Sequence, residues 1–321
     1  MITLNKLRRK PRHFQKFTGL TVTEFERVLA EVIPAYEQGE YQRRNRGEWT
    51  RRPGAGRPHA LALPERLLMG LLYLRLYCSQ SLLSYLFDLD ESNLCREFQQ
   101  RLLPLLLEVL PVPLRALAPT SEDKAACETS GKKRKRLNTL QELLQAHPEF
   151  EALLVDATEQ EVPQPADKRK RKQAFSGKQH DHTLKTQIVA TKNVILHVFG
   201  GLPGSLHDMT VLRASGVLHQ LPQGVKVRLD KGYQGADTAY PAVQVQQPIK
   251  KKRNHPMSAF GKAYNPLLSI LRIPVAHHFA RLQRFGCLAG LWRGAQNGHE
   301  DVFCIVSGLL NLRATGRLEL V

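Results

Sequence analysis

The chain has 321 residues, of which 42% are hydrophobic, and its formal net charge at pH 7 is +18. No run approaches the roughly 20 apolar residues that span a bilayer, and no apolar core follows the basic first ten residues, so neither a membrane segment nor a signal peptide is expected. The five cysteines are scattered without a CxxC pair, which argues against a zinc site or a disulfide framework and fits a reducing cytoplasm.

The excess of Lys and Arg predicts a polyanionic partner. Phosphate neutralisation scales with the number of basic side chains that a protein presents, so nucleic acid is the favoured partner. An anionic membrane surface is the alternative, and it is disfavoured because no amphipathic basic helix stands out in the sequence.

Residues 1–16 are basic and show little periodicity, which fits either a mobile arm that contacts phosphate or a solvated tail. A helix is expected to begin near Thr21, with Thr23 as a possible cap, and to end at Pro34. A basic loop rich in Gly and Pro follows at 43–58. It could lie in a DNA minor groove, with Arg57 in its Gly-Arg-Pro sequence, or be a solvated linker.

Three helices are predicted in the next segment, over 64–77, 79–87 and 94–107, although Pro104 should kink or end the third. Tight turns between them, and polar residues where the third begins, are typical of a helix-turn-helix. A three-helix core without a DNA role is the alternative, and the charge favours DNA binding. The candidate base or phosphate contacts are Ser92, Asn93, Arg96 and Gln100.

From residue 153 the pattern changes to α/β. Apolar runs predict strands at 153–157, 185–191, 194–199 and 225–229, with a turn at 192–193, a polar basic turn at 163–172 and a helix from Ser205 to about Leu218. Two antiparallel strands followed by a crossover helix and a further strand predict a mixed sheet. The expected segments are a basic arm and first helix at 1–59, a helix-turn-helix domain at 60–118, a linker and short helix at 119–150, and an α/β domain at 151–321.

Two isolated carboxylates stand at the ends of predicted strands. Asp156 follows a buried apolar run, and Asp230 ends another. Hard divalent cations such as Mg²⁺ take one or two carboxylates, water and substrate phosphate as ligands, and two such ions can cleave a phosphodiester. Alone, two such aspartates are weak evidence, because each could be a turn residue or a helix cap.

Six ordered motifs follow one another in the α/β part, namely VDAT at 155–158, FSGK at 175–178, HTLKTQ at 182–187, PGSLHD at 203–208, DKGYQG at 230–235 and LRIPV at 271–275. These motifs resemble those of bacterial insertion-sequence transposases of the DDE superfamily. The resemblance extends over about 153–313 and implies a ribonuclease-H-like mixed sheet with flanking helices, preceded by an all-α helix-turn-helix domain. It also implies two Mg²⁺ or Mn²⁺ ions, double-stranded DNA with terminal inverted repeats as partner, strand transfer into target DNA, a homodimer and a cytoplasmic, nucleoid-associated protein.

Asp156 and Asp230 match the first two acids of the family triad, but the position of the third acid is Ala276. Arg272, four residues earlier, is retained, whereas the basic residue seven positions later is Gln283. Replacing a ligand carboxylate by a methyl group is expected to impair catalysis by orders of magnitude. The substitution could be introduced or result from natural decay. Substitute carboxylate or imidazole groups, rated lower, are Asp208, Glu159, His277 and Glu300.

The remaining candidates are placed by the same resemblance and by charge. A non-catalytic DNA-binding protein, acting as a repressor or architectural factor, is the alternative function, and a nuclease acting on RNA or hybrids is less favoured. Groups expected to support the site are His207, Asp208 and Tyr233. Expected DNA contacts in the α/β part are Lys178, His182, Lys185, Lys231, Arg272, Lys250, Lys251, Lys252 and Arg253.

Overall fold

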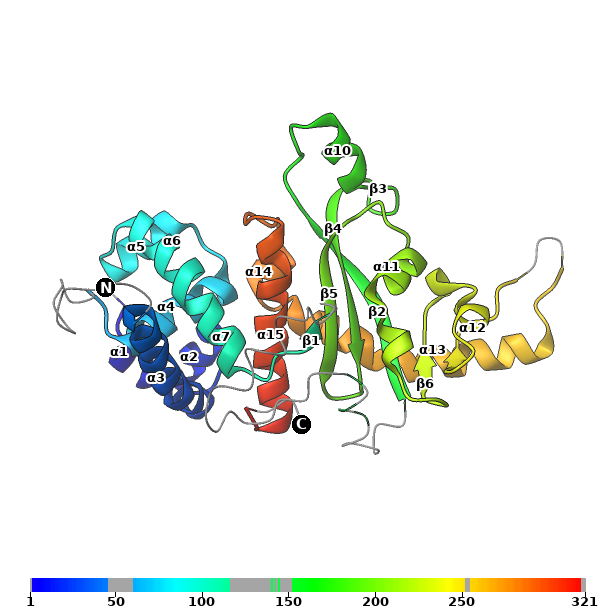
Figure 1. Cartoon of the computed structure of the whole chain (residues 1–321), viewed down its shortest axis with the longest axis horizontal. Helices are drawn as coiled ribbons and strands as arrows, with labels where there is room; N and C mark the ends of the chain where they lie inside the picture. Colours follow the sequence, from blue (N-terminus) through cyan, green and yellow to red (C-terminus); the bar gives the residue numbers. More distant parts are fainter. Residues whose placement is uncertain are drawn as a thin grey trace. The chain divides into compact units, whose positions relative to one another are not determined.

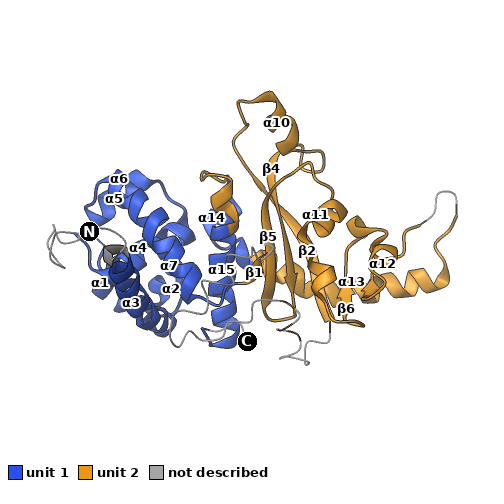
Figure 2. Ribbon diagram, in the orientation of Figure 1, with its two compact units in different colours: residues 1–112, 281–291, 301–320 blue, residues 113–280, 292–300, 321 orange. Residues whose placement is uncertain are grey.

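The computed structural model of the chain describes residues 2–45, 60–115, 140, 142, 144, 152–251 and 255–318. The chain divides into two compact units, each built from discontinuous segments (Figure 2). The first comprises 1–112, 281–291 and 301–320, and the second comprises 113–280, 292–300 and residue 321. The boundaries expected at 59, 118 and 150 lie outside the described residues, as do most residues of the linker and short helix expected at 119–150.

The first unit is all helical (Figure 1). Asp90 caps α6 by accepting from the backbone N–H groups of Ser92 and Asn93, and Asp88 adopts a left-handed conformation (φ 54°) in the turn before it. Its helices are α1 (Leu4–Arg8), α2 (Pro11–Thr18), α3 (Val22–Asn45), α4 (Leu63–Leu76), α5 (Gln80–Phe87), α6 (Glu91–Glu97), the π-helical η1 (Phe98–Leu102), α7 (Leu103–Val109), α14 (Gly286–Ala289) and most of α15 (Asn297–Thr315).

The expectation of an irregular basic arm over 1–16 is wrong. α1 and α2 occupy this stretch, and they bury Leu4, Leu7 and Phe14 while their basic residues point outward. The three apolar residues are few, but each is packed at less than 8% exposure. Burial of sparse apolar side chains is therefore sufficient to order the segment.

α3 begins where the sequence predicts, but its cap and its end differ from the prediction. Thr21, not Thr23, is the cap, because Thr21 and Glu24 exchange side-chain-to-backbone hydrogen bonds in a capping box. Pro34 lies inside the helix instead of ending it. Its ring is on the exposed side, while Phe25, Val28 and Val32 are fully buried on the other, and this burial outweighs the lost hydrogen bond.

The helix expected at 94–107 also continues through its proline. It runs as α6, η1 and α7 without interruption. The π-helical turn ends directly before α7, where the N–H of Leu103 donates to the carbonyl of Phe98, and Pro104 then stands in the first turn of α7. The π-helical turn changes the hydrogen-bond pattern directly before Pro104, so the proline costs α7 no hydrogen bond. The helix therefore continues from α6 through α7.

The second unit is built on a seven-stranded mixed sheet, which confirms the expected α/β class. Its order is β1-β5-β4-β2-β6-β7, with β3 paired to β4; β2–β4 and β4–β5 are antiparallel, and β2–β6 and β6–β7 are parallel. The observed central strands are longer than predicted. The strands are β1 (Leu114–Arg115), β2 (Ala152–Glu161), β3 (Phe175–Ser176), β4 (Asp181–Ala190), β5 (Ile195–Pro203), β6 (Lys226–Arg228) and β7 (Gln244–Gln246).

Two predictions about connections in this unit are wrong. The basic stretch expected as a polar turn forms α10 (Lys168–Ala174), capped by the Asp167 side chain. The helix expected to begin at Ser205 is α11 (Asp208–Ser215), followed by the 3-10 turn η2 (Val217–Gln220). Ser205 is instead held by its N–H, which donates to the carbonyl of Gln173, so the chain stays irregular until His207.

Helices cover both faces of the sheet. Lys185 and Gln187 on β4 contact Asp208 and Ser215 of α11 on one face. On the other face, His299 in the first turn of α15 contacts Thr186 and Gln160. This side also carries α13 (Ala259–Leu282), whose buried residues include Leu268, Val275 and Leu282 at seven-residue spacing. The apolar stretch at 301–312 packs in the first unit, where the Asn311 amide donates to the carbonyl of Pro111.

None of the helices in the described parts of the chain is both long and apolar enough to cross a membrane.

Candidate active site

Asp156 and Asp230 lie at the same edge of the sheet. β2 and β6 run parallel, and their last register pair joins Leu154 to Arg228. Each aspartate comes two residues later in the chain, Asp156 inside β2 and Asp230 just after β6 ends, so the two are level where β6 leaves β2. The parallel pairing that the sequence did not establish therefore brings together two carboxylates that are 74 positions apart in the chain.

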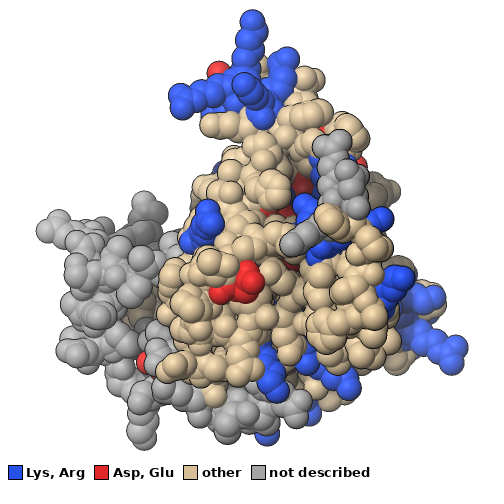
Figure 3. Space-filling view, turned by 90° about the vertical axis from the view of Figure 1, so that its right-hand side faces the viewer, with Lys and Arg blue, Asp and Glu red and all other residues tan. Residues whose placement is uncertain are grey.

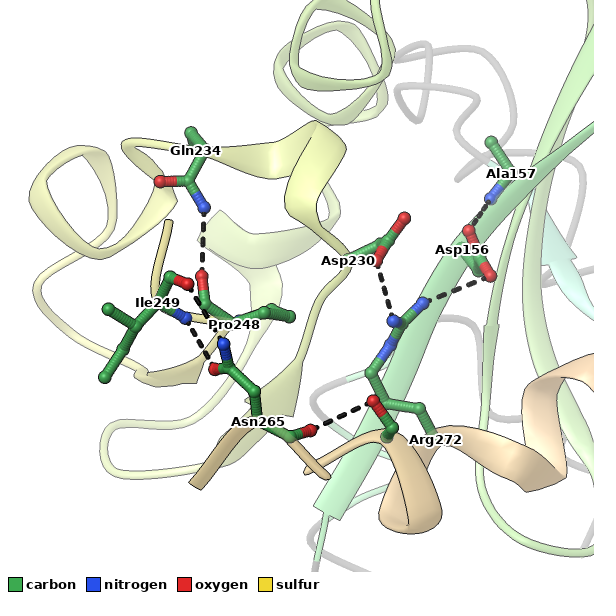
Figure 4. Close-up of polar contacts among 9 residues, drawn as sticks. Asp156, Ala157, Asp230, Gln234, Pro248, Ile249, Asn265 and Arg272 are labelled. Atoms are coloured by element: carbon green, nitrogen blue, oxygen red, sulfur yellow. Dashed lines mark hydrogen bonds and ion pairs between the residues drawn. The ribbon is translucent and has the colours of Figure 1, made fainter. Parts of the chain in front are cut away.

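One guanidinium group joins the two carboxylates (Figure 4). Arg272 of α13 donates from Nη1 to Asp230 Oδ1 at 2.8 Å and from Nη2 to Asp156 Oδ2 at 3.4 Å. The Arg272 side chain is 15% exposed, against 27% for Asp156 and 48% for Asp230. The carboxylates thus already share a cationic group, and they keep oxygen atoms that face solvent.

Burial dominates the electrostatics of this edge. It raises the pKa of Asp156, an effect that the nearby Asp230 and Asp208 carboxylates reinforce. The N–H of Ala157, which donates to Asp156 Oδ1 at 2.9 Å, and Arg272 act in the opposite direction on that pKa. Burial also raises the pKa of Tyr233 well above its ordinary value, and the same three aspartates add to the effect. A bound cation would lower the electrostatic cost of the ionised aspartates.

Ala276 follows Arg272 by one helical turn on α13. Residues four apart share a helix face, so Ala276 belongs to the side of α13 from which Arg272 reaches both aspartates. Ala276 is exposed, so a longer side chain has room there. His277 is also exposed, but it is rotated about 100° around the helix axis from Ala276.

The other candidate ligands are engaged elsewhere. Lys185 Nζ lies 3.3 Å from Glu159 Oε1 and 2.9 Å from Asp208 Oδ1, and it donates to the carbonyl of Leu206 at 2.6 Å. Glu300 accepts a hydrogen bond from the N–H of Gly200 at 3.0 Å. Within the described residues, no group of three or more His, Cys, Asp or Glu side chains could hold a metal ion. Asp156 and Asp230 therefore lack a ready third carboxylate.

Lys185 was expected at a DNA-facing surface, but only 7% of its side chain is exposed. It stands opposite Glu159 in the β2–β4 register, and Thr183 Oγ1 donates to the other Glu159 oxygen at 2.8 Å. These contacts place Lys185 in the interior of the unit rather than on its surface. Sequence reasoning missed this pair, because facing residues follow from strand register and not from spacing.

Asp208 and the loop after Asp230 are in close contact. A Cβ atom on Gly232 would lie 2.6 Å from Asp208 Oδ2, so only glycine fits there without displacing the carboxylate. Gly232 belongs to the 3-10 turn η3 (Lys231–Tyr233), whose Tyr233 is fully buried. This contact explains the glycine of the DKGYQG motif and couples the Asp208 and Asp230 loops.

The structure places the remaining predicted contacts at separate locations. His207 is exposed and precedes the first turn of α11, while His182 on β4 is partly covered and packs edge-on against Phe175. Arg57, Lys252 and Arg253 lie outside the described residues. The exposed residues are Ser92, Asn93, Arg96 and Gln100 in the first unit and Lys178, Lys231, Lys250 and Lys251 in the second.

Comparisons with known proteins identify the family of the chain. Residues 155–311 match a family model described as a DDE superfamily endonuclease, and residues 59–111 match the helix-turn-helix of the DDE superfamily endonuclease. The chain belongs to the DDE superfamily. A probable transposase for insertion sequence element IS702 from Microchaete diplosiphon is 27% identical over 301 residues, which are 94% of each chain.

The two matched regions correspond to the structural features described above. The helix-turn-helix match extends over α4 to α7, and such a domain indicates DNA binding. The endonuclease match begins one residue before Asp156 and ends in α15. Endonucleases of the DDE superfamily generally use divalent metal ions, and the expectation of an enzyme by family is confirmed.

Proposed function

We propose that this DDE-superfamily chain is a DNA transposase, which binds the terminal inverted repeats of an insertion sequence and carries out metal-dependent cleavage and strand transfer into target DNA. The observation that carries the proposal is the level placement of Asp156 and Asp230 where β6 ends beside the parallel strand β2. The name of the 27% identical relative from Microchaete diplosiphon supports transposition as the process. Two transposon ends must be joined, so we expect the active form to be a homodimer.

The residues present fit one divalent cation better than two. Asp156 and Asp230 keep solvent-facing oxygens and already hold a cationic guanidinium between them, so a Mg²⁺ or Mn²⁺ ion would find two carboxylates there. When bound, such an ion activates water or a hydroxyl group and stabilises the leaving oxygen. A second ion would need the carboxylate that Ala276 lacks.

We therefore propose that this chain catalyses cleavage poorly, because Ala276 stands where a third carboxylate is expected, and that its DNA binding is retained. Losing one ligand carboxylate removes a negative charge and an oxygen from the metal site. Misplacement of a catalytic group alone costs on the order of 100-fold in rate, and absence costs more. The helix-turn-helix surface with Ser92, Asn93 and Arg96 lies in the first compact unit, so the substitution leaves these residues unchanged.

The test compares the chain with Ala276→Glu and with Ala276→Gln, which has the same size but no charge. Nicking of supercoiled DNA is measured with Mg²⁺ and with Mn²⁺. We expect Ala276→Glu to cleave at least about 100-fold faster than the other two proteins. Equal rates for the Glu and Gln variants, with DNA binding intact, would show that position 276 is not the third ligand.

A non-catalytic DNA-binding function is the second candidate, and Ala276 itself is the observation that favours it. In that case the chain would bind an inverted repeat specifically through the helix-turn-helix surface. Specific binding without any cleavage, even by Ala276→Glu in the presence of Mn²⁺, would favour a repressor or architectural factor over a transposase.

A further inference from the structure

A second basic segment, called the α10 arm below, projects from the second unit between β2 and β4 (Figure 1). We define it as residues 162–180, with α10 at its tip and β3 on its return. Figure 3 shows that Lys and Arg side chains gather on this projection, at the top of the view. The side chains of Lys168, Arg169, Lys170 and Lys172 are all exposed. The arm therefore presents its charge away from the body of the unit.

The charge of α10 is poorly compensated by the protein itself. Among the described residues, none of the four exposed basic side chains forms an ion pair, and the acidic Asp167 serves as the helix cap. Arg171 differs, because its guanidinium donates to the carbonyls of Pro165 and Ala166 and so holds the arm's own turn. Like charges at i,i+3 and i,i+4 repel one another on a helix surface. A polyanion would relieve the repulsion between Lys168 and Lys172.

The base of the arm is fixed. The N–H of Val162 donates to the carbonyl of His182, and the N–H of Ser205 donates to the carbonyl of Gln173. β3 pairs with β4 through Phe175 and His182. Gly204 has no room for a side chain, because a Cβ atom would meet Thr183 and the carbonyl of Ala174. A charged tip on an ordered base loses little conformational entropy when it binds.

The arm follows directly on the C-terminal end of β2. Asp156 and Glu161 lie on the same strand, five residues apart, and the arm begins at residue 162. Five strand residues extend about 17 Å, and one turn of B-form DNA is about 34 Å. A duplex that passes Asp156 and runs along β2 would therefore reach the base of the arm about half a helical turn further on.

We propose that α10 is a second DNA-backbone contact, through which Lys168, Arg169 and Lys172 grip the phosphates of the duplex engaged at Asp156 and Asp230. The inference rests on the proposed function of that edge. These three residues lie within about 100° on the helix and so form one face. Contacts to phosphate alone carry no base information, so the arm adds affinity and register but not sequence specificity.

The test uses the triple variant Lys168→Gln, Arg169→Gln and Lys172→Gln. The matched control replaces three exposed basic residues elsewhere in the same unit, namely Lys192→Gln, Arg213→Gln and Lys226→Gln. The affinity for a duplex of about 30 bp and arbitrary sequence is measured without divalent cations between about 50 and 200 mM salt. We expect the arm variant to lower the slope of log K against log salt by about 2–3, because each phosphate that is no longer neutralised reduces the slope by roughly 0.9.

The control is expected to keep the slope of the unmodified chain. Equal slopes for the arm variant and the control, with the unmodified chain binding duplex normally, would overturn the arm assignment alone. Failure of the unmodified chain to bind any duplex would overturn the assignment together with the proposed function. Because all six substituted side chains are exposed, we expect thermal unfolding to be the same for both variants.

Discussion

Two clusters on β2 combine a basic side chain with two carboxylates, and they differ in how far the charges are satisfied. On one face, Lys185 joins Glu159 to Asp208, and the side chains of Lys185 and Glu159 are only 7% and 6% exposed, while that of Asp208 is 26% exposed. In the other cluster, Arg272 joins Asp156 to Asp230, and the side chains of these two aspartates are 27% and 48% exposed. The first cluster is closed, with further hydrogen bonds from Thr183 and to Leu206.

The difference separates a mostly buried ion pair from a more exposed one. A buried ion pair with saturated hydrogen bonds has no vacant ligand position, and removing one partner leaves an uncompensated charge. The open pair keeps carboxylate oxygens that solvent and ions can reach, and burial raises the pKa of Asp156 there. Similar residue types thus hold the fold together at one site and remain available for chemistry at the other.

The largest expected effect comes from breaking the closed cluster. Lys185→Met should leave Glu159 buried without its cation and destabilise the chain by about 3–5 kcal/mol. Urea unfolding followed by circular dichroism measures this loss. The double variant Lys185→Met with Glu159→Gln should recover part of it, because the unpaired charge is gone. A loss below about 1 kcal/mol in the single variant would mean that the pair is not a structural element.

A third polar group in the second unit, His197, is buried without an ion pair among the described residues. His197 on β5 is 1% exposed, neither ring nitrogen has a hydrogen-bond partner among the described residues, and burial lowers its pKa to about 4. The folded-state pKa lies below the ordinary 6.5, so the unfolded chain binds the proton first. Above pH 6.5, His197 therefore does not lower the free energy of unfolding. As the pH falls from 6.5 toward 4, the free energy of unfolding decreases, because protonation of His197 favours the unfolded chain.

His197→Leu should remove this pH dependence and raise the free energy of unfolding at pH 5 by about 1–2 kcal/mol. His299, whose pKa burial also lowers to about 4, is kept in the variant and should retain its own contribution. Urea unfolding at pH 7 and pH 5 separates the two. An unchanged difference between these pH values in His197→Leu would show that His197 is not neutral inside the fold.

Removal of the basic side chain should have a favourable effect in the open cluster: it should strengthen the binding of a metal ion to the two aspartates. Arg272→Gln removes the cation that the two aspartates share, so Mn²⁺ should bind about 3–10-fold more tightly, or about 1 kcal/mol. Arg281→Gln, on the same helix, is the control and should leave the affinity unchanged. Isothermal titration calorimetry measures both. Equal or weaker binding by a correctly folded Arg272→Gln variant would contradict the competition between Arg272 and the ion.

The sequence was sufficient to locate the open cluster but not the closed one. Asp156 and Asp230 each end an apolar run, and this local pattern is visible without a structure. The pairing of Glu159 with Lys185 depends on strand register, which one-residue shifts would alter entirely. Arg272 was expected to contact DNA, whereas its position between the aspartates depends on the packing of α13 against the sheet.

Other misses have equally specific causes. Five consecutive basic residues have no helical periodicity of charge, so α10 was expected as a turn, and the Asp167 cap that favours a helix stands outside the run. The apolar face of α15 was visible, but its partner was not. Which surface an apolar helix covers depends on contacts between distant segments, such as the hydrogen bond from Asn311 to Pro111.

The most direct test of the account is the binding of Mn²⁺ to the chain, Ala276→Glu and Ala276→Gln, with Asp156→Asn as the reference for a lost ligand. Titration followed by electron paramagnetic resonance gives the affinity and stoichiometry. We expect Ala276→Glu to bind at least about 10-fold more tightly than Ala276→Gln and to take up a second ion, and we expect Asp156→Asn to abolish tight binding. Equal affinity and stoichiometry for the Glu and Gln variants, or unchanged binding by Asp156→Asn, would contradict this expectation.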